Sequence, residues 1–211
     1  MYKAVIFDMD DTLIKTRVAK YRAHKHAAKY FYDLAITDED LNQHWGKPFE
    51  VMVGDLYKNV EPTEQIIEKY YSISGQFPIS AYPGAREIVS TIGERLVIGL
   101  LTAANQKLML AALRDAQIDV GVFQYVQTSE HTNFHKPDPR VFEPAIQYLN
   151  IQHIKKEEIM YVGDSLDDYV AATKAGLGFV GIHDHTNKKE IFDRAGVDSI
   201  GEFGELLEKL F

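Results

Sequence analysis

The first dozen residues constrain this chain more than any other stretch. An apolar run, Val5-Ile6-Phe7, leads directly into two carboxylates one residue apart, Asp8 and Asp10. Such a run is typical of a strand buried in a parallel sheet, and ligands of these sheets bind outside the carboxyl ends of the strands. Two like charges this close raise a pKa or require a cation. The stretch predicts a nucleophile, an acid/base partner and a metal ligand, with an acidic turn as the alternative.

Strand-like and helix-like patterns alternate along most of the chain. The expected strands cover residues 3–7, 96–101, 123–128, 159–162 and 178–182. The helices expected between and after them cover residues 85–93, 105–115, 140–149, 166–175 and 204–210. This alternation predicts an α/β fold with a doubly wound parallel sheet. Residues 16–80 interrupt it, since they carry only helical spacing and helix-start signals.

Composition narrows the class of function. The formal net charge of -8 argues against non-specific binding to nucleic acid or to anionic membranes. The chain has no cysteine, which excludes disulfides, thiolate metal sites and cysteine nucleophiles. No apolar run approaches the ~20 residues that cross a bilayer, and the N-terminus enters a strand without a signal segment. We expect a cytoplasmic protein that is a monomer or a weak homodimer.

Polar side chains follow four of the expected strands. In chain order they are Asp8 and Asp10, Thr102, Lys136, and then Asp164 and Asp168. Because the carboxyl ends of parallel strands lie at one edge of a sheet, we expect these side chains to converge on one site.

In order and spacing, these segments resemble the motifs of the haloacid dehalogenase superfamily of phosphotransferases. The motifs are Asp8-Met9-Asp10-Asp11-Thr12-Leu13, Leu100-Leu101-Thr102, His135-Lys136-Pro137-Asp138-Pro139 and Gly163-Asp164-Ser165-Leu166-Asp167-Asp168. Each motif alone would be weak, and the order of all of them makes the resemblance specific. It spans about residues 3–183 and points to the helical-cap phosphatase branch. It implies a Rossmann-like core domain of residues 1–15 and 81–211, with an all-helical cap domain of residues 16–80.

The resemblance also implies catalytic roles. Asp8 would be the nucleophile that forms an aspartyl-phosphate, and Asp10 the general acid/base. Thr102 would bind a phosphoryl oxygen, or alternatively cap the next helix. Lys136 would bind the phosphoryl group and neutralise its charge, although a lone lysine is more often solvated. The second carboxylate, Asp10, disfavours the dehalogenase branch of the superfamily.

A magnesium site follows from the same resemblance. Asp164 would be a ligand of Mg²⁺, together with the side chain of Asp8 and the backbone carbonyl of Asp10. Asp168 would either hold a metal-bound water or orient Lys136. The alternative for this acidic group is compensation of the helix dipole.

Two positions depart from the family pattern. Asp11 stands where glycine is usual, and we expect the turn to be kept because aspartate tolerates the left-handed conformation. Asn105 follows Ala103 and Ala104 instead of coming directly after Thr102. Asn105 is therefore either a contact to the leaving group or the cap of the next helix.

The expected cap domain contains a loop that resembles the family's substrate-specificity loop, His44-Trp45-Gly46-Lys47-Pro48. His44, Trp45 and Lys47 would contact the leaving group, and the alternative is a solvated loop with Trp45 packed in the cap core. Two further histidine groups are expected not to form metal sites. We interpret His24-Lys25-His26 as a solvated helix face, and His183-Asp184-His185 as a polar loop and not a second metal cluster.

These observations favour a magnesium-dependent phosphatase that acts on a small phosphorylated metabolite. A capped phosphomutase of the beta-phosphoglucomutase type would use the same residues. A phosphonate hydrolase would require a Schiff-base lysine from the cap, for which Lys47 and Lys58 are the candidates. A non-catalytic module that binds a phosphorylated ligand is the alternative outside enzymes.

Overall fold

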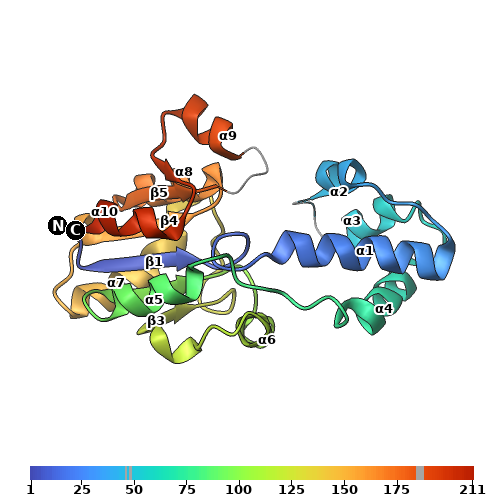
Figure 1. Ribbon diagram of the computed structural model, residues 1–211, viewed down its shortest axis with the longest axis horizontal. Coiled ribbons are helices and arrows are strands. Elements are labelled where there is room, and N and C mark those ends of the chain that lie inside the picture. Colours follow the sequence, from blue (N-terminus) through green and yellow to red (C-terminus); the bar gives the residue numbers. More distant parts are fainter. Residues whose placement is uncertain (46, 48, 184–187) are drawn as a thin grey trace. The chain divides into compact units, whose positions relative to one another are not determined.

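A computed structural model describes residues 1–45, 47, 49–183 and 188–211 (Figure 1). The chain divides into two compact units. Unit 1 consists of Met1–Lys15 and Ala81–Phe211, and unit 2 consists of Thr16–Ser80. None of the helices within the described residues is both long and apolar enough to span a bilayer.

Unit 1 is built on a parallel sheet, which confirms the predicted α/β fold. Within the described residues its strands are β1 (Ala4–Asp8), β2 (Val97–Leu101), β3 (Tyr125–Gln127), β4 (Ile159–Gly163), β5 (Gly178–Ile182) and β6 (Ser199–Ile200). Their order across the sheet is β3-β2-β1-β4-β5-β6 (Figure 1). The order reverses beside β1, and ligands of doubly wound sheets bind at such a reversal.

Helices connect these strands. The α-helices of unit 1 are α5 (Ala85–Gly93), α6 (Gln106–Asp115), α7 (Glu143–Ile151), α8 (Leu166–Ala175), α9 (Lys188–Ala195) and α10 (Leu206–Leu210). The short 3-10 helices are η1 (Val120–Val122), η2 (Pro139–Phe142), η3 (Lys156–Glu158) and η4 (Phe203–Glu205). The helix expected at 140–149 therefore begins later, because Asp138 caps a 3-10 turn that starts at Pro139. The sequence did not predict α9 or β6.

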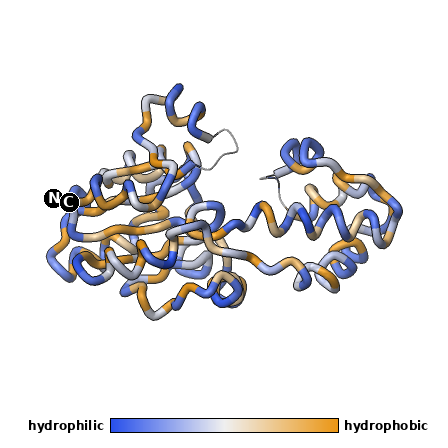
Figure 2. The backbone as a smooth tube through the Cα atoms, viewed as in Figure 1, coloured by the Kyte–Doolittle hydropathy of each residue, from blue (hydrophilic) through white to orange (hydrophobic). Residues whose placement is uncertain are grey.

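The core of unit 1 lies on the strands. Every residue of β1 is buried. Figure 2 colours this strand mainly as hydrophobic. One core cluster joins Ile6 of β1 and Tyr161 of β4 to Phe142 of η2 and to the α8 residues Ala171 and Ala172. Because burial fixes the strands, the loops at their carboxyl ends start from fixed points.

All the secondary-structure elements among the described residues of unit 2 are helices. Its helices are α1 (Thr16–Tyr32), α2 (Asp38–His44), α3 (Phe49–Leu56) and α4 (Thr63–Ser74). Helix α2 begins at the predicted acidic stretch, where Thr37 and Asp40 form a reciprocal capping box. Unit 2 has a core of its own that is rich in aromatic and aliphatic side chains.

The structure corrects the expected exposure of His24. Its side chain is fully buried, whereas the sequence predicted a solvated helix face. The ring of His24 stacks on Tyr70 with centroids 4.1 Å apart, and its Nδ1 lies 3.1 Å from the hydroxyl of Tyr57. Burial lowers the pKa of His24 to about 4. The neighbouring residue His26 is exposed, so only part of this helix face meets solvent.

Candidate active site

Strand β1 delivers Asp8 to the carboxyl edge of the sheet, where the chain turns sharply. The Met9 carbonyl accepts hydrogen bonds from the amides of Leu13 (3.0 Å) and Ile14 (3.2 Å). Asp11 adopts φ 56°, so it occupies the left-handed conformation in place of the usual glycine. The turn is kept, as predicted, and it leaves Asp8 buried.

Lys136 lies between two carboxylates. Its Nζ is 2.6 Å from Asp8 Oδ1 and 2.6 Å from Asp168 Oδ1. A third contact of 3.1 Å joins Nζ to the hydroxyl oxygen of Tyr161. An ammonium group has three N–H donors, so these acceptors occupy all of them. The structure therefore brings together three segments that are far apart in the sequence.

Asp168 lies in the first turn of helix α8, and both oxygens of its carboxylate accept hydrogen bonds. Oδ2 accepts hydrogen bonds from the Ser165 amide (3.0 Å) and hydroxyl (2.5 Å), which form a capping box with Asp168. Oδ1 accepts from Lys136 and from the Tyr161 hydroxyl (3.2 Å). These contacts support the orienting role that the sequence left open for Asp168. Its role as a metal ligand stays a prediction.

Gly163 permits this close approach. A Cβ atom added at Gly163 would lie 2.6 Å from Asp168 Cγ, far inside van der Waals contact. The glycine at the end of β4 is therefore required for Asp168 to reach Lys136.

The electrostatics of the site are dominated by excess negative charge. Burial raises the pKa of Asp8 well above its ordinary value; the carboxylates of Asp168, Asp164 and Asp10 add to the rise, and Lys136 opposes it. Burial alone would lower the pKa of Lys136, but the charges of Asp8 and Asp168 and the Tyr161 phenol outweigh it, and the pKa rises. The proton therefore stays on Lys136, and added positive charge would favour the ionised form of Asp8.

The excess of carboxylates over cationic side chains bears on whether the site fits a divalent cation. Carboxylate oxygens are the ligands that Mg²⁺ prefers, and a cation beside Asp8, Asp10 and Asp164 would offset the repulsion that raises the pKa of Asp8. The donor chemistry therefore fits Mg²⁺. Among the residues that the structure describes, no three histidine or acidic side chains are already gathered into a metal-holding group. The magnesium site remains a prediction.

Thr102 follows β2 and faces the first motif. Its backbone amide donates to Gln127 O (2.9 Å), which ties it to the neighbouring strand β3. The Thr102 hydroxyl donates to Asp10 Oδ2 (3.2 Å) and accepts from the Ala104 amide (3.0 Å). Thr102 is thus placed beside Asp10, where its hydroxyl could exchange one partner for a phosphoryl oxygen.

Asn105 caps helix α6. Its Oδ1 accepts a hydrogen bond of 2.9 Å from the Leu108 amide. This is the capping alternative that the sequence left open, and a contact from Asn105 to the leaving group stays a prediction.

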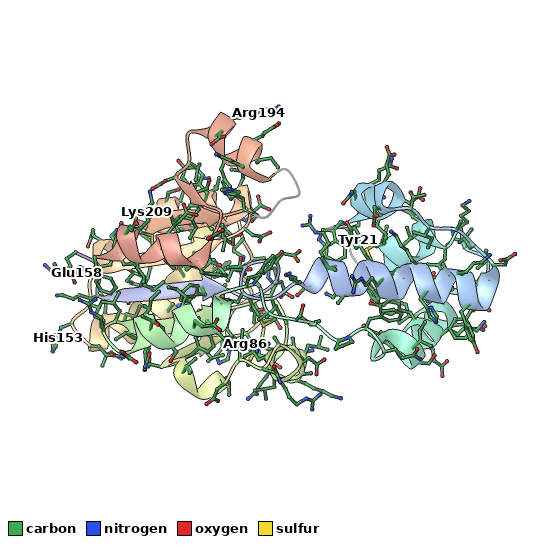
Figure 3. All side chains as sticks on the ribbon, viewed as in Figure 1. Tyr21, Arg86, His153, Glu158, Arg194 and Lys209 are labelled. Carbon is green, nitrogen blue, oxygen red and sulfur yellow. The ribbon has the colours of Figure 1, made fainter. Side chains whose placement is uncertain are left out.

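The three loop residues expected to contact substrate belong to unit 2 and have partners within it. The Trp45 ring lies edge-on to Tyr21, with centroids 5.2 Å apart; Tyr21 is labelled in Figure 3. Lys47 Nζ contacts Asp55 Oδ2 at 2.9 Å, and His44 Nδ1 contacts the Asp40 carbonyl at 2.7 Å. These contacts match the packing alternative for Trp45.

Two expectations fall partly outside the described residues. Gly46 and Pro48 of the same loop are not described, nor are Asp184 and His185. Of that second histidine group, His183 is placed by a hydrogen bond from its amide to Ile200 O (3.0 Å).

Sequence reasoning missed Tyr161. It lies within the apolar run of β4, where it was interpreted only as part of a buried strand. Its place is explained by the register of the sheet, which only the structure supplies: Ile6 pairs with Tyr161, and side chains two residues apart on a strand share a face. Tyr161 therefore shares its face of the sheet with Asp8.

Comparison with known proteins gives one consistent result. The family model described as haloacid dehalogenase-like hydrolase matches residues 5–182. A Clostridium perfringens protein assigned as the pyrophosphatase PpaX is 28% identical, over 86% of this chain and 84% of its own. The phosphoglycolate phosphatase of Nitrosospira multiformis is 29% identical, over 82% of this chain and 80% of its own. A Thermotoga maritima structure assigned as a beta-phosphoglucomutase superposes with a TM-score of 0.85 at 23% identity, covering 100% of this chain and 98% of that one.

Proposed function

The chain belongs to the haloacid dehalogenase-like hydrolase family, and we propose that it is a magnesium-dependent phosphatase that hydrolyses a small phosphorylated metabolite through an aspartyl-phosphate on Asp8. The family and its phosphatase-named relatives support a phosphoric monoester hydrolase. The observation that carries the proposal is the position of Lys136 between Asp8 and Asp168. A buried cation beside the carboxylate that would attack phosphorus can stabilise the negative charge of the phosphoryl group during its transfer.

In the first half of the reaction, an oxygen of Asp8 attacks phosphorus and the bond from phosphorus to the leaving oxygen breaks. Asp10 gives its proton to that oxygen, so that an alcohol leaves and Asp10 becomes a carboxylate. Asp8 loses its negative charge in the acyl phosphate. Lys136 then has only one full carboxylate partner, Asp168, and can turn an N–H toward the phosphoryl oxygens.

In the second half, Asp10 takes a proton from water as the water oxygen attacks phosphorus. The bond between phosphorus and Asp8 breaks, which releases inorganic phosphate, restores the Asp8 carboxylate and leaves Asp10 protonated for the next cycle. The Thr102 hydroxyl, which donates to Asp10 Oδ2 at 3.2 Å, would turn its one hydrogen to a phosphoryl oxygen when substrate binds. When bound, Mg²⁺ would be held by Asp8, Asp164 and the Asp10 carbonyl, and would supply positive charge to the phosphoryl group.

The residues that select the substrate are also a proposal. We retain His44, Trp45, Lys47 and Asn105 as candidate contacts to the leaving group. The relatives named for pyrophosphate and for phosphoglycolate suggest anionic, compact substrates.

The test is a screen of phosphorylated metabolites with Mg²⁺ that includes pyrophosphate, phosphoglycolate and an aryl phosphate, with release of inorganic phosphate as the readout. Asp8→Asn, which keeps the size of the side chain, is the matched control. Release that depends on Asp8 would support the proposal. A chain that instead converts one sugar phosphate to its isomer, needs a bisphosphate primer and releases little phosphate would be a mutase.

A further inference from the structure

Tyr161 occupies a rigid position beneath Lys136. It lies on β4 with no exposed surface, in the middle of the core of unit 1. Its ring meets Phe142 edge-on, with centroids 4.7 Å apart and an interplanar angle of 76°. Phe179 lies on another side at 6.3 Å. Because a packed aromatic ring on a central strand has little freedom, the place of the Tyr161 hydroxyl is set by the fold.

The hydroxyl is used in both directions. It accepts a hydrogen bond from Lys136 Nζ at 3.1 Å and donates one to Asp168 Oδ1 at 3.2 Å. The phenol thus touches both members of the ion pair that faces Asp8. A phenylalanine would fill the same volume and leave one N–H of Lys136 and one lone pair of Asp168 without this partner.

During the proposed reaction the partners of Lys136 do not all behave alike. Asp8 changes from a carboxylate to an acyl phosphate and back, so its attraction for the ammonium falls and returns. Tyr161 and Asp168 do not react. Their hydrogen bonds to Lys136 stay in place while the ammonium group turns between Asp8 and the phosphoryl group.

We propose that Tyr161 is a positioning residue for this reaction, whose hydroxyl fixes the ammonium of Lys136 and the carboxylate of Asp168 relative to Asp8. The inference rests on the proposed phosphatase function and concerns the same site. Without the hydroxyl, only the carboxylates of Asp8 and Asp168 position the Lys136 ammonium group. The ammonium group then shifts from the position that suits the reaction. A displacement of about 1 Å in a catalytic group costs up to ~10²-fold, and we expect a smaller loss here, on the order of tenfold in kcat. KM changes less, since Tyr161 lies beneath Lys136 and does not touch substrate.

The experiment compares Tyr161→Phe with Tyr148→Phe in the full chain, with Mg²⁺ and the best substrate of the screen. Tyr148 is a matched control, because its hydroxyl also makes a hydrogen bond within unit 1, to Gln124 O at 2.8 Å, away from the site. Both kcat and KM are measured, and rates are divided by the folded fraction from urea unfolding followed by circular dichroism. Partial unfolding then cannot imitate slow catalysis.

The inference predicts a lower kcat in Tyr161→Phe alone, with KM within about threefold of the wild type. Equal kcat in Tyr161→Phe and wild type, or equal losses in both variants, would overturn it while the phosphatase function stands. Failure of the proposed function would look different: the wild type itself would release no phosphate, or Asp8→Asn would release it at the wild-type rate, and the role of Tyr161 would fall with it.

Discussion

Lys136 Nζ lies 2.6 Å from Asp8 Oδ1, although the two residues are 128 positions apart in the sequence. The pair is largely buried, with 17% of the Lys136 side chain and 6% of the Asp8 side chain exposed. A buried ion pair of this kind costs desolvation and contributes little stability by itself. Its place at the reversal of the strand order, in contact with Asp168 as well, indicates a role in chemistry.

Removal of the cation at this site should affect both activity and stability. In Lys136→Met, Asp8 and Asp168 would remain buried without their shared partner, which typically costs about 3–5 kcal/mol. We expect activity to fall by at least ~10²-fold, as for loss of a group that stabilises transition-state charge. Phosphate release and urea unfolding measure the two effects. Lys107→Met, at an exposed position of α6, is the control and should change neither.

A methyl group at Gly163 should disturb the position of Asp168 in the same site. The added Cβ of Gly163→Ala would fall 2.6 Å from Asp168 Cγ, so Asp168 must move away from Lys136. We expect a loss of activity on the order of 10²-fold, with a moderate loss of stability. Gly204→Ala is the matched control, since a Cβ at Gly204 would meet nothing within 4 Å. Equal activities in the two variants would show that the position of Asp168 does not matter.

The stability of unit 2 should depend on pH through His24. The pKa of His24 falls from its ordinary value of 6.5 to about 4 because the side chain is buried. Below pH 6.5 the unfolded chain takes up a proton that the folded chain refuses, so stability is lost as pH falls from about 6.5 to about 4. The full effect is about 3 kcal/mol.

This dependence can be isolated with His24→Phe, which keeps an aromatic ring but cannot titrate. Trp45 is the only tryptophan of the chain and lies in unit 2, so its fluorescence during urea unfolding reports on that unit. The free energy of unfolding should fall more steeply with acid in the wild type than in the variant. Parallel curves between pH 7 and pH 4.5 would contradict the buried, neutral His24.

Removal of divalent cations should abolish phosphate release. Burial and the carboxylates around Asp8 raise its pKa, and without added positive charge the anionic form of this proposed nucleophile is disfavoured. We expect chelation to reduce activity to background and Mg²⁺ to restore it. Asp164→Asn should require a higher Mg²⁺ concentration for half-maximal activity. Full activity after exhaustive chelation would contradict the metal site.

The sequence predicted the sheet of unit 1 well because its strands are continuous apolar runs. The expected strand at 178–182 matches β5, the one at 3–7 is displaced from β1 by one residue, and the one at 96–101 begins one residue before β2 and ends with it. The strand expected at 123–128 is shorter. Phe123 ends the η1 turn, and the Thr128 hydroxyl bonds to Glu130, so only Tyr125–Gln127 pair with β2.

What the sequence could not supply were contacts between distant segments. A tyrosine within an apolar strand and a histidine followed by Lys25 and His26 give no local sign of their partners. Tyr161 meets Lys136 only because β4 lies beside β1, and His24 is buried only because α1 packs against α4. The edge at which the motif residues gather followed from the strand pattern, whereas their hydrogen bonds depend on side-chain packing.

The most direct test of the account is to trap the covalent intermediate. The wild type and Asp8→Asn are mixed with a substrate labelled in its phosphoryl group, quenched in acid within one turnover, and mapped by peptide. The account predicts label on Asp8 of the wild type and none on the variant. Label that persists in Asp8→Asn, or that maps to another residue of a chain that turns over substrate, would contradict it.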